Sequence, residues 1–311
     1  MADAQEAFRA ISARKDQWPG LVIALPLGGF GIDTRLPFGL ASATGVWETV
    51  ADLVKVMLVH QVAGLRVIKW VDDFIFVKPP SSVVELKDIH AATESLGFPW
   101  HPSKFSEFGP KVTYLGFEWD LHKMTVKLPD DKRDAFRQRV AAFRHSDVKT
   151  LKEVREVCGS LQHITMMARD LAPYLSEFYN FLAAWSAKSQ YQKLYVPVPV
   201  QDEAKVWFKA LQNEMIRTTR MPKNVFPLTL YVDASTEWGI GLTCEDKWAA
   251  WMLLAGWDTN GRGIGWAESA ALELGVRQAV ELGASNCVLN IFSDNKGVIG
   301  AFKRGRSRGR S

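Results

Sequence analysis

The sequence predicts an α+β protein in which a helical region separates two regions that contain strands. Three observations support this prediction. Strand and helix patterns alternate over residues 1–128, helical patterns alone fill residues 129–195, and strand patterns return from residue 226. We expect residues 196–225 to connect the helical region to a last domain over residues 226–311. A chain of 311 residues is long enough for this organisation.

The first region contains recognisable helix and strand patterns. We expect a hairpin over Leu21–Ile32, with its turn at Gly28 and Gly29, because apolar runs flank a glycine pair there. Apolar spacing then predicts helices, β-rich runs predict strands, and the expected elements follow in this order: a helix over Ser42–His60, strands over Leu65–Trp70 and Phe74–Val77, a helix over Ser82–Leu96, and paired strands over Lys111–Trp119 and Met124–Lys127.

The remaining regions differ from each other in periodicity. Residues 129–195 have the apolar spacing of three amphipathic helices, Asp130–Phe143, Thr150–Met167 and Leu171–Ala187. Val196–Pro199 has alternating prolines, which favour an extended connector before a helix over Asp202–Arg217. Beyond it, the patterns predict strands over 228–232, 239–244 and 248–254, a helix over 268–282, a strand over 287–292 and a helix over 295–302.

Composition indicates a folded globular protein, with 47% hydrophobic and 23% charged residues. The net charge of +4 does not by itself establish a nucleic-acid partner. Five basic residues lie in the last segment, Lys303–Ser311, and such a tail either binds phosphate or is simply solvated. Composition alone leaves both readings open.

The cysteines and the hydropathy pattern bear on the cellular compartment. Cys158, Cys244 and Cys287 lie far apart and are odd in number, which argues against a disulfide framework or a zinc site and favours a reducing compartment. The sequence contains neither a signal-peptide core nor a long uncharged apolar stretch. We therefore expect a soluble intracellular protein, in the cytoplasm or the nucleus, with no membrane partner.

Two adjacent aspartates, Asp72 and Asp73, lie at the tip of the expected hairpin between the two β-rich runs. Like charges on a rigid turn repel each other unless a cation lies between them, so this arrangement suits Mg²⁺. Phosphoryl transfer uses such a metal pair. Asp is also a favoured turn residue, however, and an aspartate pair alone is more often only a turn.

The segments around this pair resemble motifs of reverse transcriptases. Trp70–Asp73, with the sequence WVDD, resembles the YxDD box, although Trp replaces Tyr. Upstream, Leu36–Ala43 resembles the LPFGLxxAP motif, although Thr44 stands where Pro is usual. Asp3–Arg9 resembles the first catalytic motif, an Asp followed five residues later by an aromatic residue. These segments occur in the order typical of the family.

The resemblance extends downstream and narrows to a subfamily. Tyr114–Phe117 resembles the primer-grip hairpin, with Met124–Leu128 as its return strand. The stretches DTRLPFGL, LGFEWDLHKMTVKLP and SDNKGVIGAFKRGRSR are most similar to DIRS-type retroelements, which are retrotransposons that use a tyrosine recombinase. The fold that this resemblance implies is a reverse-transcriptase palm and a helical thumb, followed by an α/β RNase H-like domain.

The resemblance also implies roles for particular residues. Asp3, Asp72 and Asp73 would hold two Mg²⁺ ions, with Mn²⁺ as an alternative, and Asp3 and Asp72 would bridge both ions. The implied nucleotide-binding residues are a steric gate at Phe8, two residues beside the incoming nucleotide, and a lysine that meets the pyrophosphate: Phe8, Phe38, Gly39 and Lys104. The implied primer grip consists of Tyr114, Leu115, Gly116 and Phe117. Without the resemblance, Phe8 would be an ordinary core aromatic and Lys104 a solvated charge.

Three acidic residues of the last region resemble the carboxylates of the RNase H fold. Asp233 ends a predicted strand, Glu268 opens a predicted helix, and Asp294 ends a later strand. The resemblance implies that these three residues hold two further Mg²⁺ ions. Glu273 is a rival for the helical position, but it lies five residues further on and therefore on a different face of the helix.

Both ends of the chain differ from the family pattern. Only Met1 and Ala2 precede Asp3, so we expect the fingers subdomain to be absent and Asp3 to lie on a frayed terminus. We also expect the RNase H-like domain to be incomplete at its C-terminal end, with an exposed sheet edge.

The expected function is RNA-directed DNA synthesis from dNTPs, with RNA template, DNA primer and RNA–DNA hybrid as partners, and with associated RNase H activity. A homodimer, or a separate fingers-containing segment, could complement the chain. The alternative is a non-catalytic nucleic-acid-binding remnant of a degraded retroelement, and a purely structural protein is a third candidate.

Overall fold

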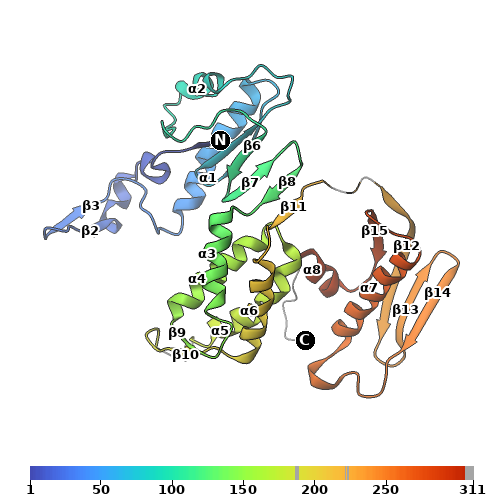
Figure 1. Ribbon diagram of the computed structural model, residues 1–311. Helices are drawn as coiled ribbons and strands as arrows, with labels where there is room; N and C mark the ends of the chain where they lie inside the picture. Colours follow the sequence, from blue (N-terminus) through green and yellow to red (C-terminus); the bar gives the residue numbers. More distant parts are fainter. Residues whose placement is uncertain (186–188, 221, 223, 305–311) are drawn as a thin grey trace. The chain divides into compact units, whose positions relative to one another are not determined.

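The computed structural model describes residues 1–185, 189–220, 222 and 224–304 (Figure 1). It contains both helices and antiparallel and parallel strands, as the predicted α+β class requires. The chain divides into two compact units, Met1–Lys123 and Met124–Ser311. Of the basic tail, residues 305–311 lie outside the described residues. No described helix is long and apolar enough to cross a membrane.

The first unit is built around a small antiparallel sheet. Its three strands lie in the order β1 (Ala2–Asp3), β5 (Asp73–Val77), β4 (Arg66–Trp70). Helix α1 (Ala43–Gln61) packs against β4 and against α2 (Leu86–Glu94). Fully buried side chains join these elements into one core: Trp47, Val54, Leu58, Phe74 and Ile89.

Smaller elements complete the first unit. They are the short helices η1 (Ala7–Ala10) and η2 (Lys15–Gly20) and two hairpins, β2 (Val22–Ala24) with β3 (Phe30–Ile32), and β6 (Lys111–Tyr114) with β7 (Phe117–Asp120). The predicted hairpins and the first helix are confirmed. The predicted strand over Lys111–Trp119 is instead two strands, because Leu115 and Gly116 adopt positive φ angles of 50° and 76° and reverse the chain.

The second unit begins with a helical part. Its elements are β8 (Thr125–Lys127), α3 (Asp130–Ala141), β9 (Val148–Lys149), α4 (Leu151–Thr165), η3 (Arg169–Leu175), α5 (Ser176–Ala183), β10 (Leu194–Tyr195), α6 (Val198–Ala210) and β11 (Ile216–Thr218). Strand β8 pairs with β11, and β9 pairs with β10. The helices pack through fully buried residues that include Leu161, Phe178 and Trp207.

Three predictions for the helical part were wrong, and proline explains two of them. The helix expected over Asp202–Arg217 instead covers Val198–Ala210, and Arg217 lies on β11. The helix expected over Leu171–Ala187 is divided into η3 and α5, because Pro173 lacks an N–H group; residues 186 and 187 lie outside the described residues. Of the extended connector expected at Val196–Pro199, Val198 and Pro199 are the first two residues of α6, and Pro197 is its N-cap. Pro199 is accommodated in the first turn, where a backbone N–H would have no helical partner.

The α/β part of the second unit follows the predicted order of elements. The elements are β12 (Val225–Ser235), β13 (Gly239–Cys244), β14 (Lys247–Met252), η4 (Thr259–Gly261), α7 (Ile264–Glu281), β15 (Val288–Phe292) and α8 (Lys296–Arg304). The strands lie in the order β14-β13-β12-β15, and only the β12–β15 pair is parallel.

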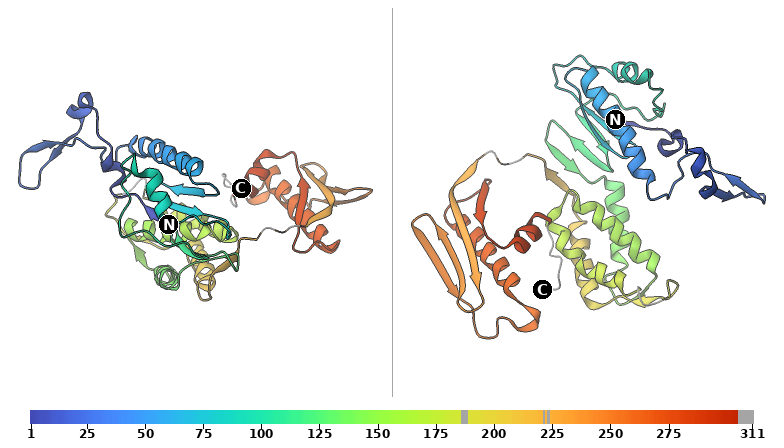
Figure 2. Two further views of the ribbon diagram at one scale, coloured as in Figure 1. Left: turned by 90° about the horizontal axis from the view of Figure 1, so that it is seen from above. Right: turned by 180° about the vertical axis from the view of Figure 1, so that it is seen from behind.

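Helix α7 packs along the sheet, against β12, β13 and β15 (Figures 1 and 2). Gly275 permits this close approach, because a Cβ at this position would lie 2.9 Å from Cγ1 of Val232 on β12. The helix begins at Ile264, four residues before the predicted start, so Glu268 lies in its second turn.

Candidate catalytic centres

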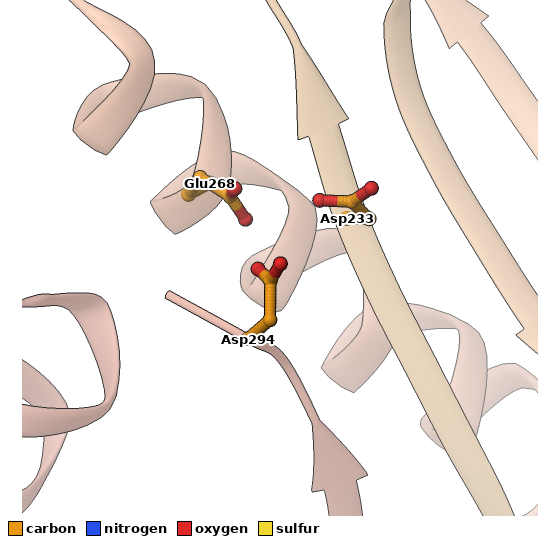
Figure 3. Close-up of side chains that lie close together, drawn as sticks. All are labelled: Asp233, Glu268 and Asp294. Atoms are coloured by element: carbon orange, nitrogen blue, oxygen red, sulfur yellow. The ribbon is translucent and has the colours of Figure 1, made fainter. Parts of the chain in front are cut away.

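Three carboxylates meet at one edge of the α/β part. Asp233 lies near the carboxyl end of β12, Glu268 lies on α7, and Asp294 follows β15. Because β12 and β15 are parallel, their carboxyl ends lie at the same end of the sheet, and α7 packs against both strands. One ligand atom from each carboxylate lies within 4.8 Å of the others (Figure 3).

Glu268 is the buried member of this acidic cluster, with 4% of its surface exposed. Burial raises the pKa of Glu268 above the ordinary value, and the nearby charges of Asp233 and Asp294 raise it further. Hydrogen bonds from the Asn295 side chain and the Ala234 backbone act in the opposite direction. Oxygen Oε2 of Glu268 has no hydrogen-bond partner.

These features fit a divalent cation. Mg²⁺ prefers carboxylate oxygens as ligands, and a cation would offset the mutual repulsion of the three charges. The unpaired oxygen of Glu268 could coordinate it. Asp233, Glu268 and Asp294 are therefore the residues that could hold a metal here. Glu273 points elsewhere: it is exposed and pairs with Arg277 at 2.6 Å.

Strand pairing places two of the three acidic residues expected in the first unit opposite each other. In the register of β1 with β5, Asp3 lies opposite Asp73, and the backbone N–H of Ala4 donates to the carbonyl of Asp72 at 2.9 Å. Asp3 is only 7% exposed, one of its oxygens accepts from Lys104, and the other has no partner. Asp73 has a raised pKa, caused first by burial and then by the charges of Asp72 and Asp3.

The expectation that Asp3 lies on a frayed terminus was wrong. The backbone N–H of His101 donates to the carbonyl of Asp3 at 2.8 Å, and the terminal ammonium of Met1 donates to Oγ of Ser106 at 3.0 Å. These bonds, with the pairing to β5, hold the short strand β1 on the sheet. The Asp3, Asp72 and Asp73 carboxylates do not converge within 4.8 Å, a spacing that in the described part of the chain only the Asp233 cluster has.

The turn that carries Asp72 is strained. Val71 and Asp72 form a two-residue connection between the paired residues Trp70 and Asp73. Val71 has a φ of 53°, which is unfavourable for a β-branched residue. The indole N–H of Trp47 donates to the Val71 carbonyl at 2.8 Å and stabilises this conformation. This role of Trp47 was not predicted from the sequence, in which the only sign of it is the general need of a buried indole N–H for an acceptor.

Of the expected nucleotide-binding residues, Lys104 contacts one of these carboxylates, that of Asp3. The Phe8 ring meets the Phe38 ring edge-on, with centroids 5.3 Å apart. Phe38 is 69% exposed, and Gly39 adopts a φ of 85° with open space around it. Lys104 pairs with Asp3, and this hydrogen bond is the main reason that the pKa of Lys104 is raised.

The expected primer-grip residues form the tip of the β6–β7 hairpin. Leu115 and Gly116 make the turn, and Tyr114 and Phe117 are buried beneath it. Burial raises the pKa of Tyr114 to about 12, with a contribution from the Asp73 charge. The hairpin is therefore near the aspartate turn. The strand expected to return beside it, Met124–Leu128, forms β8 and pairs with β11.

No protein-family model matches the sequence, and no curated protein matches it. Solved structures do match. The foamy viral protease-reverse transcriptase in its dRH form with double-stranded DNA has a TM-score of 0.53 at 16% identity, over 99% of this chain and 52% of that one. The foamy viral protease-reverse transcriptase with an RNA/DNA hybrid has a TM-score of 0.56 at 16% identity, over 100% of this chain and 40% of that one. Another complex of the foamy viral protease-reverse transcriptase with double-stranded DNA has a TM-score of 0.51 at 18% identity, over 97% of this chain and 60% of that one.

The chain thus spans about half the length of these structures. At such low identity the likeness concerns the fold. The chain has the α+β fold of a reverse transcriptase, with a palm and a helical thumb followed by an RNase H-like domain.

Proposed function

We propose that this chain is a reverse transcriptase segment that carries an RNA-directed DNA polymerase centre and an RNase H centre. The observation that carries the proposal is the position of the acidic groups on this fold. Asp3 faces Asp73 on the palm sheet, and Asp233, Glu268 and Asp294 converge on the RNase H-like sheet. The matched foamy viral proteins, which were solved with double-stranded DNA or an RNA/DNA hybrid, support nucleic acid as the partner.

In the proposed polymerase centre, Asp3, Asp72 and Asp73 hold Mg²⁺ or Mn²⁺. Bound metal would activate the primer 3′ oxygen and stabilise the departing pyrophosphate. Phe8, edge-on to Phe38, would exclude a ribose 2′-hydroxyl, so that dNTPs are the substrates. The open space at Gly39 would admit the nucleotide.

Two further groups have proposed roles in this centre. Lys104, which pairs with Asp3, would meet the pyrophosphate. Tyr114, Leu115, Gly116 and Phe117 would hold the primer end through the β6–β7 hairpin.

We propose residues 1–128 as the palm, residues 129–195 as the thumb and residues 226–311 as the RNase H-like domain. Within the proposed connector, residues 196–225, helix α6 packs on α3 and α5, so we assign this helix to the thumb. The DIRS-type retrotransposon origin rests on the three sequence stretches that resemble those elements.

The polymerase proposal is tested by Mg²⁺-dependent extension of a DNA primer on an RNA template. The control is the double variant Asp72→Asn plus Asp73→Asn, which removes two carboxylates from a turn and leaves its size unchanged. Extension by the wild type that disappears in the double variant would support the proposal. Extension that survives in the double variant would contradict the assignment of these aspartates.

A specific observation favours a second candidate, a nucleic-acid-binding protein without polymerase activity. Lys104 occupies one oxygen of Asp3, and the carboxylates of the first unit do not converge as those of the second unit do. Salt-sensitive binding of primer–template without extension would support this candidate. Cleavage of the RNA strand of an RNA–DNA hybrid, with Asp233→Asn as control, tests the RNase H centre independently.

A further inference from the structure

The RNase H-like sheet carries a row of small residues that begins at the acidic cluster. The Val232 side chain lies against Gly275 of α7, so its neighbours in β12 point to the sheet face opposite α7. In the register of β12, β13 and β14, one row on this opposite face is Asp233, Gly241 and Ala250. The row forms a low floor, because glycine and alanine have the smallest side chains.

Aromatic side chains stand beside this floor. The neighbouring row is Tyr231, Thr243 and Trp248, and the Trp248 side chain is 77% exposed. Trp238, in the turn between β12 and β13, is also exposed. These aromatic residues and the floor line a hollow of about 420 Å³.

The hollow suits a flat ring. A Cβ built at Gly241 would meet no atom within 4 Å, so the space above this residue is open. The Tyr231 ring is held by stacking on Phe292 of β15, with centroids 5.2 Å apart and 21° between the planes. Nucleobases stack on exposed aromatic side chains because every base has a π-face. A base in a double helix is already stacked on both faces, so only an unpaired base could enter.

Asp233 connects the hollow to the acidic cluster. One of its oxygens lies within 4.8 Å of ligand atoms of Glu268 and Asp294, and Asp233 also lines the hollow. A nucleotide whose base occupies the hollow would bring its phosphate close to these carboxylates. The charges would repel the phosphate unless a divalent cation were bound between them.

We propose that the hollow between Tyr231, Trp238 and Trp248 binds an unpaired nucleobase of a strand whose phosphate lies at the acidic cluster. The inference rests on the proposed RNase H centre and deepens it, because it names a preferred substrate, a hybrid with an unpaired nucleotide at this centre. The shared Asp233 favours a nucleotide over an apolar protein surface, since a cation held there would attract phosphate.

The test is photocross-linking of the full chain to an RNA–DNA hybrid that contains one unpaired iodouracil in its RNA strand. Ca²⁺ serves as the cation, to limit cleavage, and mass spectrometry identifies the cross-linked peptide. Gly241→Val is the informative variant, because valine is favoured in strands and its side chain would fill the floor of the hollow. Trp248→Ala is a second variant. Phe302→Ala is the control, since it removes a similarly exposed ring from α8, and circular dichroism monitors folding.

We expect the wild type and Phe302→Ala to cross-link at the aromatic residues of the hollow. The yield should be about tenfold lower in Gly241→Val, in Trp248→Ala and in EDTA. A wild-type cross-link elsewhere in the chain, or an equal yield in folded Gly241→Val or in EDTA, would overturn the inference. A wild type that sediments as a dimer while Trp248→Ala is monomeric would also overturn it, because a second copy would then cover the hollow.

Cleavage of a fully paired hybrid is measured separately. Cleavage by a wild type that forms no cross-link in the hollow would overturn this inference and leave the RNase H centre in place. A cation-dependent cross-link in the hollow without any cleavage would support base binding and contradict the RNase H activity. The two failures are therefore distinguishable.

Discussion

Replacing Asp294 by Asn should stabilise the metal-free RNase H-like domain and remove its response to Mg²⁺. The three carboxylates of the cluster have ligand atoms within 4.8 Å of one another, and Glu268 among them is buried. Without a cation the three charges repel one another when ionised. The Asp294→Asn substitution would preserve the size of the side chain and the backbone while removing one charge.

The magnitude follows from the spacing. Two unit charges separated by 4.8 Å repel by about 0.9 kcal/mol in water and by about 3.5 kcal/mol at an effective dielectric constant near 20. Asp294 is exposed, so the lower value applies, and we expect a gain of about 1 kcal/mol in the free energy of unfolding. Bound Mg²⁺ at a hundredfold excess over Kd would stabilise the wild type by about 2.7 kcal/mol. The order of stability should therefore reverse when Mg²⁺ is added.

Hydrogen–deuterium exchange of peptides from β12 and α7 measures this local stability within the full chain. In EDTA, exchange through opening of the domain should be about fivefold slower in Asp294→Asn than in the wild type. In saturating Mg²⁺ the wild type should be the better protected. Slower exchange of the wild type in EDTA, or equal protection of both proteins by Mg²⁺, would refute the repulsion argument. The measurement should be made above neutral pH, because the pKa of Glu268 is raised.

Three further predictions concern packing and burial. Gly275→Ala should destabilise the RNase H-like domain by about 1–3 kcal/mol, because the new Cβ would crowd Val232. Gly159→Ala in α4, which has open space around it, should instead stabilise the protein by up to about 1 kcal/mol. Chemical denaturation of the two variants compares their free energies of unfolding. Tyr114→Phe should be neutral or stabilise by about 1 kcal/mol, because the buried Tyr114 hydroxyl has no partner, and a loss above about 1 kcal/mol would show that it has one. Glu203 accepts the N–H groups at the start of α5, and burial raises its pKa above the ordinary value of 4.5. The folded state thus holds the proton of the Glu203 carboxyl more tightly than the unfolded chain does. The wild type should therefore lose stability relative to Glu203→Gln as the pH rises above about 4.5, which thermal melts across pH would measure. A difference in melting temperature that stays constant with pH would contradict this prediction.

The sequence by itself predicted most of the elements in their order, and its resemblance to reverse transcriptases and RNase H supplied the candidate acidic residues. Apolar periodicity is a local property, so the helix at Ser42–His60 and the strands around Asp233 and Asp294 could be predicted from neighbouring residues. The resemblance supplied Glu268, and local geometry placed the rival Glu273 on another face, since five residues along a helix turn the side chain away. The hairpin at Asp72 was predicted from turn chemistry in the same way.

Only the tertiary structure decided which distant groups meet. The pairing of β8 with β11 joins segments that precede and follow the whole set of thumb helices, and the ion pair of Lys104 with Asp3 joins residues 101 positions apart. The convergence of Glu268 with Asp233 and Asp294 depends on how α7 packs against β12 and β15. Local patterns indicate which face of a helix or strand is apolar. They do not state which partner covers that face, because this depends on the shapes and charges of side chains brought together by the whole chain.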